Sequence, residues 1–206
     1  FFGAETALSA HALVRNGGGL SISGLTLSGG QLRLEATAET TSDNFLRQLS
    51  LNAVVSDPAG EPVTLPVAGA ATRLNSAQLN IDYGSTTDVT APQDWRANLN
   101  VSGFTQPGLS ADKLEMAVNG VATALDDPAN RMVTFNGDGA LSGIAADPGI
   151  EAALGREIGI GVAGVYKAGQ PVQLAQLRVV GAALTAGLAG QLDGLDFTGD
   201  IGLETA

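Results

Sequence analysis

Apolar and polar residues alternate strictly along much of this chain, and that alternation is its dominant pattern. In residues 31–39, Leu32, Leu34 and Ala36 fall on one side and Arg33 and Glu35 on the other. A period of two is typical of a β-strand with one face buried. The same period recurs over residues 49–55, 63–67, 79–83, 95–101, 114–118, 133–135 and 158–162. In the final third, small residues and glycines loosen the spacing, which predicts bulges or tight corners.

Turn-forming residues separate these runs at short, fairly regular intervals. Examples are residues 16–19, 57–60, 106–108, 126–128 and 167–171, which combine Gly, Pro, Asp and Asn. Such spacing predicts an all-β fold, as a sandwich, a barrel or a long layered sheet, and the absence of intervening helical periods argues against parallel βαβ units.

One short helix is expected where the alternation pauses. Asp147 is placed to cap it, Pro148 suits its first position and Gly155 suits its end. A second helical turn is expected at residues 43–46. We interpret residues 1–206 as a single elongated β segment, with a soft break near residues 143–157. The abrupt start and finish suggest a piece of a longer chain.

The apolar side of the alternation has two interpretations. It becomes an ordinary core if a second sheet covers it, or an aliphatic groove if the sheet curls into an open trough. The predicted lining of that groove is Leu32, Leu34, Leu49, Leu51, Val63, Leu65, Leu79, Ile81, Leu99, Val101, Leu114, Met116, Val118, Val133, Phe135, Ile158 and Ile160.

Composition narrows the function classes. Aromatic residues make up only 4% of the chain while the apolar set reaches 44%, so any buried surface is aliphatic. The formal charge of -11 argues against nucleic acid, because a phosphate-binding surface needs clustered Lys and Arg. There are no cysteines, which excludes disulfides and thiolate chemistry. No apolar run approaches the ~18 residues of a membrane span.

Candidate catalytic and metal-binding residues are sparse. His11 is the single histidine and lies in a poorly patterned stretch, so a Ser-His-Asp triad is not expected. Asp193, Asp196 and Asp200 come nearest to a carboxylate site, but their spacing suits a solvated strand face better than a calcium loop. Residues 17–19 are three glycines without the Lys of a phosphate loop. We therefore predict no enzyme, no metal and no cofactor.

Several stretches together resemble the TamB family of translocation and assembly module proteins, which is related to AsmA-like proteins. They are GLSISGLTLSGGQLRLEATAETTSDNF, DPAGEPVTLPV, LSGIAADPGIEAALGREIGIGVAG, GQPVQLAQLRVVG and LAGQLDGLDFTG, in this order over most of residues 18–203. The ALGRE segment, with its preceding Ala-Asp-Pro, carries most of the resemblance. The resemblance supplies no catalytic motif, so the lining residues above rest on the alternation alone.

The resemblance implies a periplasmic protein held in the inner membrane by a segment outside this chain, with a long curled sheet called a β-taco. It implies transport of phospholipid between the inner and outer membranes along a hydrophobic groove, a role in outer-membrane biogenesis and protein secretion, and an outer-membrane barrel partner of the Omp85 type, which is TamA-like. Membrane contact would come only through the missing parts of the parent chain. It favours the groove interpretation, with phospholipid acyl chains as the ligand.

The sequence is also compatible with two functions other than lipid transport. The first is a chaperone-like module that binds outer-membrane protein strands by β-augmentation at a sheet edge. The second is a closed structural β-sandwich with an ordinary core.

Overall fold

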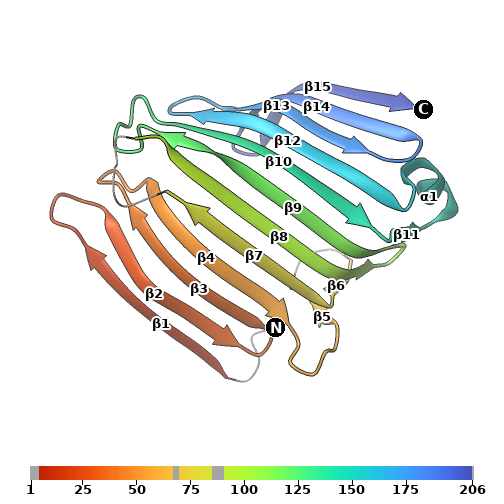
Figure 1. Ribbon diagram of the computed structural model, residues 1–206, viewed down its shortest axis with the longest axis horizontal. Coiled ribbons are helices and arrows are strands. Elements are labelled where there is room, and N and C mark those ends of the chain that lie inside the picture. The colour runs from red at the N-terminus through yellow and green to blue at the C-terminus, as the bar shows by residue number, and fades with distance from the viewer. Residues whose placement is uncertain (1–4, 67–69, 85–90, 206) are drawn as a thin grey trace.

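The computed structural model describes residues 5–66, 70–84 and 91–205. These residues form a single antiparallel sheet (Figure 1), with hydrogen-bonded order β1-β2-β3-β4-β7-β8-β9-β10-β12-β13-β14-β15. The strands are β1 (Thr6–Val14), β2 (Leu20–Gly29), β3 (Leu32–Thr40), β4 (Leu46–Ser56), β5 (Val63–Thr64), β6 (Arg73–Leu74), β7 (Ser76–Tyr83), β8 (Gln93–Gln106), β9 (Leu109–Thr123), β10 (Met132–Ser142), β11 (Ala145–Ala146), β12 (Glu157–Lys167), β13 (Val172–Val180), β14 (Leu184–Asp193) and β15 (Asp196–Thr205).

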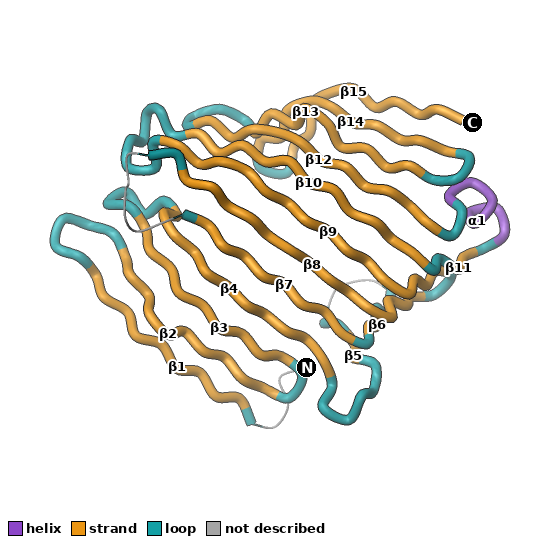
Figure 2. The backbone as a smooth tube through the Cα atoms, viewed as in Figure 1, coloured by secondary structure: helices purple, strands orange, loops and turns teal. Residues whose placement is uncertain are grey.

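The sheet is open. Within the described residues, β1 pairs only with β2 and β15 only with β14, so the two edges do not meet to close a barrel. The same residues provide no second sheet to cover either face (Figure 2). The prediction of an elongated, open all-β sheet is confirmed, and the alternative of a closed sandwich is wrong. Neighbouring strands pair because short turns join them in sequence, which favours antiparallel hairpins.

Helix α1 (Pro148–Leu154) lies between β11 and β12, where the sequence predicts it. Gly155 ends it with a positive φ of 75° and donates its backbone N–H to the Glu151 carbonyl. Asp147 occupies the N-cap position, but its side chain makes no capping hydrogen bond. The helix does not interrupt the sheet, because β10 and β12 pair continuously from Met132–Lys167 to Ser142–Glu157.

The second predicted helical turn, at residues 43–46, is wrong. This segment is a tight turn before β4, in which the Asn44 N–H donates to the Thr41 carbonyl. Asn44 has a φ of 63°, in the left-handed region that Asn tolerates better than most residues. A right-handed helix cannot pass through that conformation.

Two small buried clusters lie at opposite ends of the strands. One contains Tyr83, Ala122 and Leu125, and the other Ala111, Ile144 and Ile158. Ala111 and Ala122 both belong to β9, and eleven positions at about 3.3 Å each place them roughly 36 Å apart. The α1 residue Leu154 packs against the second cluster. Between these clusters, the apolar-side residues of the interior strands are only half-buried.

Candidate functional site: the apolar face

The strand register places the alternating apolar residues in continuous rows across the sheet. The central row crosses all twelve strands of the main path. It consists of Leu8, Leu27, Leu34, Ala53, Leu79, Leu99, Met116, Gly139, Ile160, Val179, Ala186 and Leu203. Each residue is the cross-strand partner of the next, so their side chains share one side of the sheet. We call this side the apolar face.

A second row runs beside the first, two residues along each strand. It contains Leu25, Ala36, Leu51, Ile81, Ala97, Val118, Gly137, Val162, Leu177, Leu188 and Ile201. A third row contains Leu32, Val55, Ala77, Val101, Leu114, Leu141 and Ile158. No charged residue occurs in these three rows, so the apolar face is a continuous aliphatic surface.

Burial along each strand matches a sheet with one partly sheltered side. On β3, Leu34 and Ala36 are half-buried, whereas Arg33 and Glu35 on the opposite side are exposed. On β8 and β9, Leu99 and Met116 are likewise half-buried. A residue in a covered core would be buried outright, so these side chains receive shelter from their neighbours and from the curl of the sheet rather than from a second layer.

Most of the predicted lining residues come together on this face. The three rows include Leu32, Leu34, Leu51, Leu79, Ile81, Leu99, Val101, Leu114, Met116, Val118, Ile158 and Ile160. Leu49, Val133 and Phe135 occupy the same side by alternation, nearer one end of the strands. Ile158 is buried in the cluster with Ile144, so it is less accessible than the half-buried residues of the rows.

Two predicted lining residues lie outside the twelve strands of the main path. Val63 lies in the two-residue strand β5, which pairs with β6 away from the main path, and it is completely buried. Leu65 follows β5 outside any strand. Their local alternation resembles a strand, but the chain here forms only the two-residue strand β5, which pairs with β6 rather than with a strand of the main path.

Leu25 and Leu27 on β2 also lie on the apolar face, although the alternation did not predict them. The register of β2 against β3 shifts between Ile22 and Leu25, and Gly24 has a φ of 67°. One extra residue therefore moves the apolar positions from even to odd numbers within a single strand. Gly24, a glycine inside an alternating run, is the sequence feature that could have indicated this shift.

Sequence reasoning also missed a group of four residues that we call the clasp: Asp43, Phe45, Arg131 and Tyr166. The Phe45 and Tyr166 rings stack with centroids 5.9 Å apart and planes 12° apart. Phe45 precedes β4 and Tyr166 lies on β12, five strand spacings away in the sheet order. A flat sheet would separate those strands by about 24 Å. The sheet therefore curls over its apolar face at this end.

Arg131 anchors the clasp from the loop before β10. Its guanidinium carbon lies 4.0 Å from the centroid of the Phe45 ring. Its Nε and Nη2 donate to the Leu125 carbonyl at 3.0 and 2.8 Å, and Nη2 also donates to the Asp43 carboxylate at 2.9 and 3.0 Å. Arg131 is only 5% exposed. A buried guanidinium needs this many acceptors to offset its lost hydration.

The electrostatics of the clasp lower the pKa of Asp43 to about 2. The hydrogen bond from Arg131 is the main cause, and the Thr41 hydroxyl, which also donates to this carboxylate, is the next. Both interactions favour the charged carboxylate. A carboxyl group with a depressed pKa stabilises the folded state above its ordinary pKa of 3.8, and this contribution is lost as the pH falls from 3.8 toward 2.

Asp43→Asn should consequently flatten the acid branch of the stability curve. We expect the native chain to lose stability between pH 4 and pH 2 more steeply than the variant, as measured by urea unfolding at a series of pH values. Asp57 and Asp127, whose pKa values are also lowered by hydrogen bonds, titrate in both proteins, so the difference between the two curves isolates Asp43. Parallel curves would show that Asp43 has an ordinary pKa.

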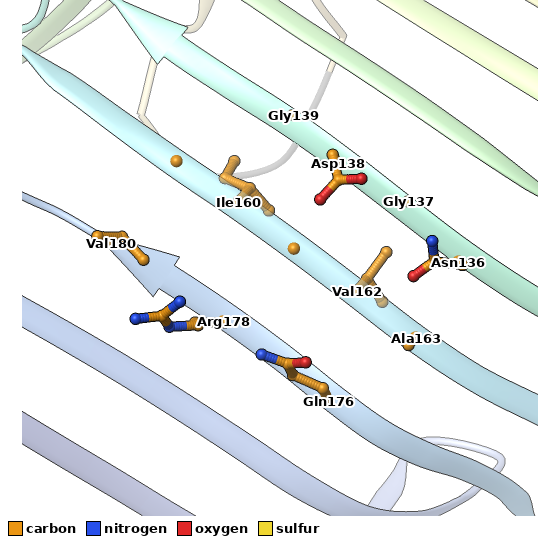
Figure 3. A pocket seen from close by; sticks show the side chains of 12 residues that line it. Asn136, Gly137, Asp138, Gly139, Ile160, Val162, Ala163, Gln176, Arg178 and Val180 are labelled. Carbon is orange, nitrogen blue, oxygen red and sulfur yellow. The ribbon is translucent and has the colours of Figure 1, made fainter.

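The opposite side of the sheet holds a shallow pocket over β12 (Figure 3). Its floor is Gly159, Gly161 and Ala163, which leave the backbone nearly bare. Asp138 on β10 and Arg178 on β13 flank Gly161, each as its cross-strand partner. The lining mixes polar and apolar residues and includes neither a histidine nor a hydroxyl nucleophile. Nothing in this pocket assembles a nucleophile, a base and an oxyanion site.

The other candidate chemistry is dispersed. His11 lies exposed on the edge strand β1, opposite Ser23. Asp193 and Asp196 face each other across the β14–β15 hairpin, and Asp200 lies further along β15. Across the described residues, no three or more His, Asp or Glu side chains are grouped so as to hold a metal ion. Nor does any helix in the described part of the chain have the length and apolar character needed to cross a membrane.

Comparison with known proteins does not assign a family. No family model, curated protein or solved structure matches this chain. The resemblance to the TamB family therefore stays a prediction from the sequence, and the apolar face is the feature from which a function has to be argued.

Proposed function

We propose that this chain is a TamB-like segment that binds phospholipid acyl chains on its apolar face and carries them along the sheet. The observation that supports the proposal most is the continuity of the central row, which crosses all twelve strands of the main path without a charged residue. Within the described residues no second layer covers the middle of this face. An uncovered aliphatic surface of this extent is typical of an interaction site rather than of an ordinary protein exterior.

The energetics of such binding are favourable. Removing apolar area from water yields roughly 25 cal/mol per Å², or ~0.8 kcal/mol for each buried methylene. A sixteen-carbon acyl chain would gain on the order of 10 kcal/mol before the cost of ordering it. Partial burial on an open face reduces this figure in proportion to the alkyl area that stays in contact with water.

The chemistry of the face suits movement as well as binding. Contacts between alkyl chains and Leu, Val, Ile and Met side chains are dispersion contacts, which have little directionality. The rows offer no charged or strongly polar group at which one lipid would stop. Passive sliding along the rows is the mechanism that follows, with no covalent step and no catalytic residue.

The cellular setting in this proposal comes from the resemblance to the TamB family. The chain would belong to a longer protein of the periplasm, anchored in the inner membrane. It would pass phospholipid toward the outer membrane in cooperation with an Omp85-type barrel. The apolar face is the part of that proposal that this chain can test by itself.

The direct test is native mass spectrometry of the 206-residue chain purified from a bacterial host without detergent, followed by lipid extraction. We expect bound phospholipid that survives size exclusion and that added phospholipid vesicles can replace after delipidation. A folded, monodisperse protein that carries no lipid and takes none from vesicles would contradict the proposal.

A further inference from the structure

The dipeptide Asn-Gly occurs three times in this chain, as Asn16-Gly17, Asn119-Gly120 and Asn136-Gly137. Glycine has no side chain to hinder its backbone nitrogen, so an asparagine that precedes glycine is the one most prone to cyclise onto the next residue. All three asparagine side chains are exposed. The local sequence and the access to solvent are thus alike at the three positions, and only the setting of the following glycine differs.

Two of the three dipeptides lie in interior strands. Gly120 is half-buried on β9 and Gly137 is buried on β10, and each of these strands pairs with a neighbour on both sides. A Cβ atom added to Gly120 would overlap the Thr134 carbonyl oxygen, and one added to Gly137 would lie 2.8 Å from the Ala117 carbonyl oxygen. The backbone at both glycines is therefore packed as well as paired, and cyclisation there would first require local opening of the sheet.

The third dipeptide lies in the turn between β1 and β2. Gly17 is exposed, has a φ of 99° and, apart from its chain neighbours, has no atom within 4 Å of the place where a Cβ would stand. The turn is closed by other groups, because the Gly18 N–H donates to the Arg15 carbonyl at 3.1 Å and the Arg15 N–H donates to the Gly19 carbonyl at 3.0 Å. No hydrogen bond among the described residues uses the Gly17 N–H. The Gly17 amide can therefore turn toward the Asn16 side chain without opening the sheet.

We infer that Asn16 is a site of spontaneous modification, at which asparagine is converted to isoaspartate and aspartate through a cyclic imide. Hydroxide removes the proton of the Gly17 amide, and the nitrogen attacks the Asn16 Cγ. The N–Cγ bond forms, the Cγ–Nδ2 bond breaks, and ammonia leaves with a proton returned by water. Water then adds to one of the two ring carbonyls. Cleavage of the N–Cγ bond gives aspartate, and cleavage of the bond from the nitrogen to the Asn16 backbone carbonyl carbon gives isoaspartate.

The products change the turn in two ways. Each conversion makes the net charge one unit more negative than the formal -11 of the parent chain. An isoaspartate also places an additional methylene in the backbone between Arg15 and Gly18, whose hydrogen bond closes the turn. Asn16 belongs to none of the rows of the apolar face, so this inference is independent of lipid binding.

The test compares the three asparagines within one protein. The complete chain is incubated in its folded state, at mildly alkaline pH, in water enriched in heavy oxygen. It is then digested in ordinary water, and mass spectrometry measures the label at each asparagine. We expect label to appear at Asn16 at least about tenfold faster than at Asn119 or Asn136, because only the latter two require local opening. In the chain unfolded by urea, the three rates should become similar. Equal rates in the folded chain, or label at Asn16 only after unfolding, would overturn the inference.

Asn16→Gln is the matched variant. Glutamine keeps the amide at this exposed position but would have to form a larger ring, which closes more slowly. We expect incubation of the parent chain to yield a more acidic species on anion exchange, which accepts a methyl group from an isoaspartate-specific carboxyl methyltransferase. The variant, shown by circular dichroism to be folded, should yield almost none of this species. Equal amounts from the two proteins would place the reaction elsewhere in the chain and contradict the assignment to Asn16.

Discussion

Leu51→Asp is expected to abolish the retention of phospholipid by the purified chain. Leu51 lies in the second row of the apolar face, with Ala36 and Ile81 as its cross-strand partners, and is half-buried. An aspartate at this position places a charge where the acyl chains would lie. Removing that charge from water costs several kcal/mol, which is roughly the free energy gained by burying several methylene groups. Native mass spectrometry should show the variant free of lipid while the parent chain carries it. Leu34→Asp, in the central row, should have the same effect.

The matched control for Leu51→Asp is Asn52→Asp. Asn52 is the next residue on β4 and is exposed on the opposite side of the sheet, between Glu35 and Asn80. The Asn52→Asp substitution introduces the same charge into the same strand but on the side opposite the apolar face, so lipid retention should not change. If Leu51→Asp folds and still carries lipid, or if both variants lose it equally, the apolar face is not the binding surface.

Arg131→Ala is expected to destabilise the fold by about 3 kcal/mol. The substitution leaves the Leu125 carbonyl without its two guanidinium donors in a position that is 3% exposed. An unsatisfied buried acceptor costs about 1–3 kcal/mol, and loss of the contact with the Phe45 ring adds about 0.5–2 kcal/mol. The free energy of unfolding is measured by urea unfolding followed by Trp95 fluorescence. Trp95 is a suitable reporter because it packs against the buried cluster that contains Leu125.

Arg96→Ala provides the comparison for Arg131→Ala. Arg96 forms an ion pair with Asp82 at 3.1 Å, but the two side chains are 71% and 58% exposed. An exposed pair contributes little, so this variant should unfold close to the parent midpoint. Arg131→Lys should recover only part of the loss, because one ammonium group cannot reproduce the planar contacts to Leu125, Asp43 and Phe45. Equal stability of Arg131→Ala and Arg96→Ala would mean that the clasp does not hold the curl.

The alternation was sufficient to predict most of the strands and most of the apolar face. A period of two assigns each side chain to one side of its own strand, wherever that strand lies, so Leu34, Leu79, Leu99 and Met116 could be grouped before their register was known. The prediction was wrong where a local feature broke the period. Gly24 shifted the apolar positions of β2, and Val63 and Leu65 alternate in a segment whose short strand β5 lies off the main path of the sheet.

The turn at residues 43–46 shows a different reason for error. The sequence of residues 43–46, Asp-Asn-Phe-Leu, is compatible with a helical turn. In the structure, however, side chains of this segment contact residues that are far away in the sequence. Asp43 bonds Arg131, 88 residues away, and Phe45 stacks on Tyr166. Those contacts exist only once the sheet has curled, so no local pattern could indicate them.

The spacing of neighbouring residues is therefore enough to establish a β-protein with aliphatic and polar sides. That the aliphatic side is not the core of a closed sandwich follows from the three-dimensional arrangement of the strands. Whether a second layer covers the aliphatic side depends on how strands far apart in the sequence pair. The alternation along each strand is the same in an open sheet and in a closed sandwich. The open edges and the clasp, which decide between a core and a groove, are properties of that arrangement.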